Sequence, residues 1–238
     1  MKDTTGIVLL HGAGLGSYIW DDVWPHLRLD TLTIDFPHRH SDKAKSLEFN
    51  DYVDVVLNRI ESWNKENIII VAHSISSVVG LAVAKKLGSK LTGFVAIGAA
   101  IPKSGGSFLS ALPLPQALIM WTAITLAGTK PPNKAIKFGL CNDLDEIQAS
   151  MVVQNFTAES KKLYTQKSHA GIPKAKTMYI KLSLDNECPM TVQNTFARNL
   201  GTQQIIVLES GHLPMMSVPG LLAETINNFA DEVVWDGL

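Results

Sequence analysis

The chain of 238 residues is long enough for one large domain with an inserted segment, and its 46% apolar and 18% charged residues suit a globular enzyme. A formal net charge of −1, without a basic run interleaved with aromatic residues, argues against a nucleic-acid partner. The two cysteines, Cys141 and Cys188, form neither a metal-ligand spacing nor a disulfide framework, and the first residues lack the apolar run of a signal peptide. We therefore expect a cytoplasmic protein.

An unbroken apolar run over residues 6–10 predicts a central strand of a parallel sheet. A glycine-rich loop follows, with glycine at positions 12, 14 and 16. This spacing lacks the third glycine of a dinucleotide fingerprint where the helix would need it, so the loop does not indicate nucleotide binding. The next strand is predicted over residues 31–35, and the apolar stripe over residues 47–64 predicts a helix that lies on the sheet.

The stretch from Asn67 to Gly80 contains the most informative turn of the chain. Residues 68–72 are apolar and predict a buried strand, and a helical pattern begins at Val78. A strand that becomes a helix within about two residues holds its turn residue in a strained conformation above the sheet, next to the first N–H groups of the helix. Ser74 stands at this turn, so it is a candidate nucleophile. The alternative is that Ser74 only caps the helix.

The rest of the chain continues the alternation of strands and helices. Further strands are predicted over residues 91–100, 177–182 and 204–208, and a last helix over 221–234. This order predicts a doubly wound α/β fold with a mainly parallel six-stranded sheet flanked by helices. Residues 1–101 and 173–238 would form its core.

Residues 102–172 interrupt the alternation, because they contain helix starts but no convincing strand. One predicted start is the capping box Asp143-x-x-Glu146. Residues 108–127 are apolar, but two prolines break their first half, which favours a partly exposed helix over a membrane span. We interpret residues 102–172 as a helical lid insertion, called the predicted lid segment below.

Candidate catalytic groups follow three of the predicted strands, at the edge of a parallel sheet where ligands bind. They are Ser74, Asp185 and His212. A serine hydroxyl needs an imidazole to take its proton, and the imidazole needs a carboxylate that fixes its tautomer. Glu187 is a rival for the carboxylate, and His212 could instead be a surface-loop histidine. His73 is interpreted as structural.

Four motifs in this order resemble the α/β-hydrolase superfamily over nearly the whole chain. They are His11-Gly12 with Trp20 beyond it, the elbow at residues 72–76, Asp185 with Pro189, and Gly211-His212-Leu213-Pro214. The resemblance implies a serine-esterase-like enzyme of short form, with an oxyanion hole made by the N–H groups of Ala13 and Ile75. We interpret His11 as a brace of the oxyanion loop rather than a group that transfers protons.

The elbow departs from the Gly-x-Ser-x-Gly pattern of that superfamily. Ala72 and Ser76 stand at the two glycine positions. Both side chains are small, which the tight turn requires.

These observations predict a serine hydrolase that cleaves a carboxylic ester with an apolar acyl or aryl part through an acyl-enzyme. Leu118, Trp121 and Leu213 are the predicted substrate-binding residues, and neither a metal nor another cofactor is expected. Two alternatives stay open. One is lyase-type acid–base chemistry on the same triad, and the other is a small-molecule sensor with slow turnover.

Overall fold

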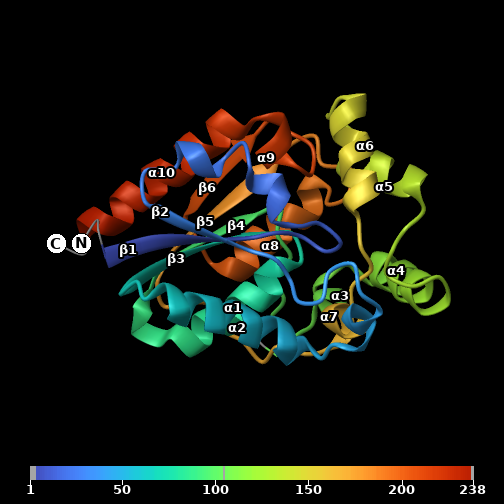
Figure 1. Cartoon of the computed structure of the whole chain (residues 1–238), viewed down its shortest axis with the longest axis horizontal. Helices are drawn as coiled ribbons and strands as arrows, with labels where there is room; N and C mark the ends of the chain where they lie inside the picture. Colours follow the sequence, from blue (N-terminus) through green and yellow to red (C-terminus); the bar gives the residue numbers. More distant parts are fainter. Residues whose placement is uncertain (1–3, 104, 237–238) are drawn as a thin grey trace.

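The computed structural model describes residues 4–103 and 105–236, and its centre is one six-stranded parallel sheet (Figure 1). The strand order is β2-β1-β3-β4-β5-β6, with every neighbouring pair parallel. The strands are β1 (Thr5–Leu10), β2 (Asp30–Ile34), β3 (Asn67–His73), β4 (Leu91–Ile97), β5 (Lys176–Leu182) and β6 (Gln204–Leu208). The predicted α/β class and parallel sheet are therefore confirmed.

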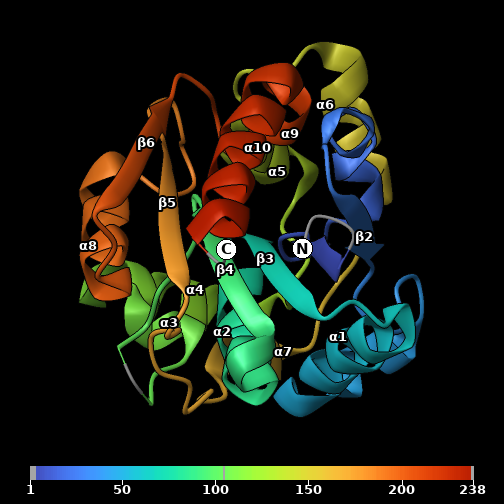
Figure 2. The same cartoon turned by 90° about the vertical axis from the view of Figure 1, so that its left-hand side faces the viewer.

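Helices cover both faces of the sheet and bury a hydrophobic core on each side (Figures 1 and 2). Side chains of α1, α2 and α8 belong to one core, and those of α10 belong to the other. Because both faces are covered, strands β1 and β3 are apolar and buried almost throughout. These helices are α1 (Phe49–Trp63), α2 (Ser76–Leu87), α8 (Met190–Leu200) and α10 (Pro219–Asp236).

The chain between β4 and β5 forms the helices α3 (Phe108–Ala111), α4 (Leu114–Leu126), α5 (Asn133–Leu140), α6 (Glu146–Asn155) and α7 (Lys161–Thr165). In its described part, residues 102–103 and 105–172, this predicted lid segment contains no strand. Within residues 4–103 and 105–236, no helix has both the length and the apolar character needed to cross a membrane. Short helices also stand between β1 and β2, after β2, before β4 and, as α9 (Pro214–Ser217), before α10.

The capping box predicted at Asp143 is wrong in position. The N-cap of α6 is Asp145, which accepts a hydrogen bond from the backbone N of Gln148. Asp143 instead accepts a hydrogen bond of 2.6 Å from the backbone N of Gly211. The predicted lid segment is thereby joined to the loop that carries His212.

Candidate active site

Ser74 occupies the predicted turn between β3 and α2, and its backbone lies in the left-handed region with φ 56°. Such a conformation costs a non-glycine residue about 1–3 kcal/mol and persists only where the surroundings hold it. Here the backbone N of Ser74 donates to the carbonyl of Ile97, and its carbonyl accepts from the backbone N of Ala100 and the hydroxyl of Ser77. The elbow is thus fixed to the neighbouring strand β4, and Ser74 lines a cavity.

The two small residues at the glycine positions are both buried within the elbow. Ala72 is fully buried beneath α2. The hydroxyl of Ser76 donates to the carbonyl of His73 at 2.7 Å and lies 3.1 Å from the carbonyl of Leu10, so this buried polar group is satisfied. With Ala72 and Ser76 at the glycine positions, the chain still forms a strand-to-helix turn with Ser74 at φ 56°.

His212 and Asp185 form a buried hydrogen-bonded pair. The Nδ1 of His212 lies 2.8 Å from Oδ2 of Asp185. Burial lowers the pKa of His212, but the charge of Asp185 and its hydrogen bond outweigh this effect, and the net pKa is raised above the ordinary 6.5. Because Nδ1 is engaged by the carboxylate, Nε2 is the nitrogen left to exchange a proton in the cavity that His212 lines.

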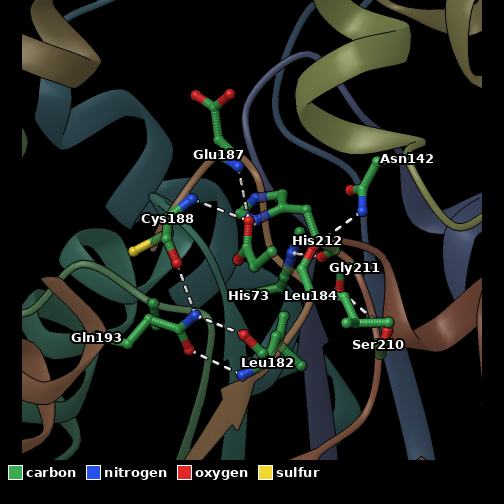
Figure 3. Close-up of polar contacts among 12 residues, drawn as sticks. His73, Asn142, Leu182, Leu184, Glu187, Cys188, Gln193, Ser210, Gly211 and His212 are labelled. Carbon is green, nitrogen blue, oxygen red and sulfur yellow. Dashed lines mark hydrogen bonds and ion pairs between the residues drawn. The ribbon is translucent and has the colours of Figure 1, made fainter. Parts of the chain in front are cut away.

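The rival carboxylate, Glu187, takes no part in this pair. Oδ1 of Asp185 accepts hydrogen bonds from the backbone N of Glu187 and of Cys188 (Figure 3). The carboxylate of Glu187 lies instead against Gly139 of α5. The structure therefore places Asp185, and not Glu187, on the imidazole of His212.

Gln193 of α8 holds the loop that carries Asp185, a role that the sequence did not reveal. Its amide accepts a hydrogen bond from the backbone N of Leu182 and donates to the carbonyls of Leu182 and Cys188 (Figure 3). These three bonds connect the end of β5 to the residues just after Asp185. A buried amide with all these partners gives the loop one defined conformation.

His73 supports the other side of His212. Its Nε2 lies 2.8 Å from the carbonyl of His212, so Nε2 carries the hydrogen and donates it. Burial and the neighbouring imidazole of His212 hold the pKa of His73 well below its usual range. His73 is therefore neutral, and its contact with the main chain agrees with the structural role that the sequence indicated.

The loop after β1 lies directly against the elbow. A Cβ atom on Gly12 would come within 3.2 Å of the Cβ of Ser74, which is tighter than an ordinary contact, so glycine suits this close approach. The carbonyl of Gly12 accepts from the backbone N of Leu15 and lies 2.8 Å from Nδ1 of His11. In a trans peptide the N–H points opposite to the carbonyl, so the N–H of Ala13 is turned away from these two groups. Ala13 lines the same cavity as Ser74 and Ile75.

His11 braces this loop in a neutral form, as expected. Its Nε2 accepts from the backbone N of Phe36, which leaves the hydrogen on Nδ1 for the carbonyl of Gly12. Burial lowers the pKa of His11 to about 4. The side chain therefore holds the loop and carries no charge near neutral pH.

Glu159 fixes the next residue of the loop from the predicted lid segment. Its Oε1 accepts from the backbone N of Gly14 at 3.3 Å, and its Oε2 accepts from the hydroxyl of Tyr52 at 3.0 Å. The carbonyl of Gly14 accepts from the backbone N of Thr157. Gly14 has φ 73°, and a Cβ there would overlap the ring of Phe156. Both polar groups of Gly14 are thus held by residues more than 140 positions away in the sequence.

We expect Glu159→Ala to lower the free energy of unfolding by about 1–3 kcal/mol, because two buried donors lose their acceptor. We also expect a lower kcat, since Ala13 adjoins the loosened residue. Glu159→Gln is the matched control, because its amide keeps the size and one acceptor oxygen. Urea denaturation and ester hydrolysis measure both effects. Equal stability and kcat in Glu159→Ala and the wild type would contradict this role.

A cavity of about 500 Å³ connects these groups. Ser74, His212 and Ala13 are among the residues that line it, and most of the other lining residues are apolar. The predicted lid segment supplies much of the lining, namely Phe108, Leu112, Pro113, Gln116, Ile119, Met120, Ala123, Ile124, Ala127, Gly128, Thr129, Lys130, Pro131, Pro132, Ala135, Ile136, Leu140, Phe156 and Tyr164. The arrangement can hold an apolar molecule with a reactive carbonyl beside Ser74.

The structure corrects the predicted substrate-binding residues, because Leu118, Trp121 and Leu213 do not line this cavity. Leu118 and Trp121 are more than half exposed on the outer face of α4. Leu213 is fully buried in the core beside α10. The residues of α4 that line the cavity include Ile119, Met120 and Ile124.

The fold and these motifs agree with a comparison against known families. A model described as "Alpha/beta hydrolase family" matches residues 7–225. The chain belongs to the alpha/beta hydrolase family. No curated protein matches this alpha/beta hydrolase in sequence.

Several solved structures share the fold of this alpha/beta hydrolase. An extracellular alpha/beta-hydrolase from a Paenibacillus species, described as similar to tobacco salicylic acid binding protein 2, is 18% identical with a TM-score of 0.83, over 94% of this chain and 98% of that one. A methylesterase from Arabidopsis is 17% identical with a TM-score of 0.77, over 95% and 99%. A pyrethroid hydrolase from Sphingobium faniae is 19% identical with a TM-score of 0.78, over 95% and 97%.

Proposed function

We propose that this alpha/beta hydrolase cleaves small carboxylic esters with an apolar acyl or aryl part through an acyl-enzyme on Ser74. One observation carries the proposal. The elbow serine and His212, whose imidazole is hydrogen-bonded to Asp185, line the same cavity, and that cavity is mainly apolar.

In the first half of the reaction, the hydroxyl of Ser74 attacks the ester carbonyl while Nε2 of His212 takes its proton. The negative charge that develops on the carbonyl oxygen is stabilised by the N–H groups of Ala13 and Ile75, each typically worth about 3 kcal/mol. Asp185 keeps the hydrogen of the imidazole on Nδ1 and stabilises the imidazolium. The C–O bond then breaks, and the alcohol leaves with the proton from His212.

In the second half, a water molecule takes the place of the alcohol. His212 removes a proton from this water, whose oxygen attacks the acyl carbonyl in the same oxyanion site. The bond to Ser74 breaks, and the serine oxygen recovers the proton from His212. The products are a carboxylic acid and an alcohol, and the enzyme returns to its starting state.

The lining of the cavity supports an apolar substrate. Of the 32 residues around it, only Glu187 and Lys130 carry a formal charge at pH 7, with His212 counted as neutral. Both charged side chains are exposed, and the wall beside Ser74 is formed by small or apolar residues. Transfer of apolar surface from water into such a site contributes about 0.8 kcal/mol per methylene.

A series of p-nitrophenyl esters of increasing acyl length tests this function. We expect kcat/KM to rise by up to about fourfold per methylene until the acyl chain fills the cavity, and then to level off or fall. Met120→Trp should move this optimum to shorter chains, because Met120 lines the cavity. Thr122→Trp is the matched control on the same helix, since Thr122 is exposed and does not line it.

Two outcomes would contradict the proposed ester hydrolysis and favour one of the two alternative functions. Cleavage of cyanohydrins without hydrolysis of any ester would indicate the lyase chemistry. Thermal stabilisation by an ester that is never consumed would indicate a sensor.

A further inference from the structure

Helix α4 presents an uncharged apolar face to solvent. Leu114 and Leu126, at its two ends, have exposed fractions of 82% and 83%, and Leu118, Ile119 and Trp121 are also more than half exposed. Ile124 is the one buried residue of the helix. Figure 1 shows α4 at the outer edge of the molecule, on the far side from α10. Clustered exposed apolar side chains of this size mark a site of interaction.

The two threonines of α4 have no hydroxyl hydrogen left to donate to water. Thr122 donates its hydroxyl hydrogen to the carbonyl of Leu118 at 2.9 Å, and Thr125 donates to the carbonyl of Trp121 at 2.6 Å. Each threonine thus directs its hydroxyl to the helix backbone. A helix face whose hydroxyls are satisfied internally suits an apolar environment.

The apolar face also borders the opening of the cavity. Ile119 lines the cavity and is nevertheless 70% exposed, so its side chain stands where the cavity meets the exterior. Gln116 and Ala123, on the same helix, are likewise both exposed and part of the lining. A molecule that enters beside these residues passes the apolar face of α4.

The chain segment that contains α4 carries only positive charges. The sequence from residue 105 to 142 contains three lysines, at positions 130, 134 and 137, and no acidic residue. Lys137 pairs with Glu146 of α6. Lys161 reaches the carbonyl of Thr125 at 3.1 Å, which places another exposed amine at the C-terminal end of α4. An apolar helix face next to lysines is complementary to a lipid surface with anionic headgroups.

We propose that α4 binds the surface of an anionic lipid bilayer, with its apolar face between the headgroups and Lys130, Lys134 and Lys161 near the phosphates. The helix has 13 residues, which is too short to span a bilayer but sufficient to lie in its interface. This orientation brings the opening of the cavity to the lipid. If the proposed function holds, the substrate is therefore an apolar ester dissolved in the membrane.

Co-sedimentation with vesicles tests the binding directly. The wild type should sediment with vesicles of phosphatidylcholine and phosphatidylserine. The double variant Leu114→Gln, Leu126→Gln should bind these vesicles at least about tenfold more weakly. Neither leucine lines the cavity, so hydrolysis of a water-soluble ester should stay unchanged. Leu221→Gln with Trp235→Gln is the matched control, since both residues are exposed apolar residues of α10, and it should bind as the wild type does.

Separate variants test the electrostatic contribution of the lysines to vesicle binding. Lys134→Gln and Lys161→Gln should each weaken binding to the anionic vesicles roughly fivefold and leave binding to pure phosphatidylcholine unchanged. Ser74→Ala should bind vesicles like the wild type, so loss of the proposed reaction is distinguished from loss of binding.

Two results would overturn the proposal. In the first, the wild type stays in the supernatant with both kinds of vesicle. In the second, gel filtration shows a dimer that the double leucine variant converts to a monomer, which would mean that a second copy of the chain covers α4.

Discussion

Ser74→Ala is expected to lower kcat for ester hydrolysis by about 10⁴- to 10⁶-fold, the largest effect of any single substitution in this chain. The variant removes the one oxygen that can form the acyl bond beside the predicted oxyanion groups. Its fold should be preserved, because the hydrogen bonds that hold the elbow run through the backbone N and carbonyl of residue 74. Steady-state hydrolysis of a p-nitrophenyl ester measures the effect, and circular dichroism checks the fold.

Ser76→Ala is the matched control for this substitution. Its hydroxyl is fully buried and directed to the carbonyls of Leu10 and His73, away from the cavity. We expect activity within about tenfold of the wild type, since the loss is one internal hydrogen bond. A Ser74→Ala protein that hydrolyses esters at the original rate would remove the basis of the proposed mechanism.

Asp185→Asn is expected to lower kcat by about 10⁴-fold and to change the pH profile. An asparagine amide can donate its own hydrogen to Nδ1 of His212 and so favours the wrong tautomer. In the wild type, the raised pKa of His212 places the acid limb of kcat/KM above pH 6.5, because the rate depends on the neutral imidazole. Without the carboxylate of Asp185, the imidazole loses the strongest of the effects that raise its pKa, so the limb should move to lower pH.

Glu187→Gln is the control for Asp185→Asn. Glu187 also raises the pKa of His212, but it makes no hydrogen bond to the imidazole in the described structure. We expect a change in kcat of less than about tenfold and a small downward shift of the acid limb. If Glu187→Gln were as damaging as Asp185→Asn, the acid would be assigned to the wrong residue.

The regular elements were predictable where one periodicity dominated. The apolar runs of β1 and β3 differ from their predicted ranges by one residue or less at each end. Strand β4 was predicted to residue 100 but ends at Ile97, because Gly98 turns the chain with φ 49°. Helix α8 was not predicted, although Pro189 before it and Gly201 after it are typical boundary residues.

The groups that support the site could not be read in the same way. Ser74, Asp185 and His212 each stand in a local motif, whereas Glu159 acts on Gly14 across 145 positions and Gln193 acts on a loop from a separate helix. No local sequence motif indicates such contacts between residues that lie far apart in the chain. The orientation of helix α4 could not be predicted either, because the helix is apolar on nearly every side. Its periodicity does not show which face lines the cavity, and the prediction for Leu118 and Trp121 was therefore wrong.

Labelling with a fluorophosphonate, followed by peptide mass spectrometry, tests the central claim most directly. This reagent phosphonylates a serine that an imidazole activates beside an oxyanion site. We predict one phosphonyl group per chain, on Ser74, with loss of ester hydrolysis in proportion to labelling, and no labelling of Ser74→Ala. Phosphonylation of a different residue, or full ester hydrolysis by a chain whose Ser74 is completely labelled, would contradict the assignment of Ser74 as the nucleophile.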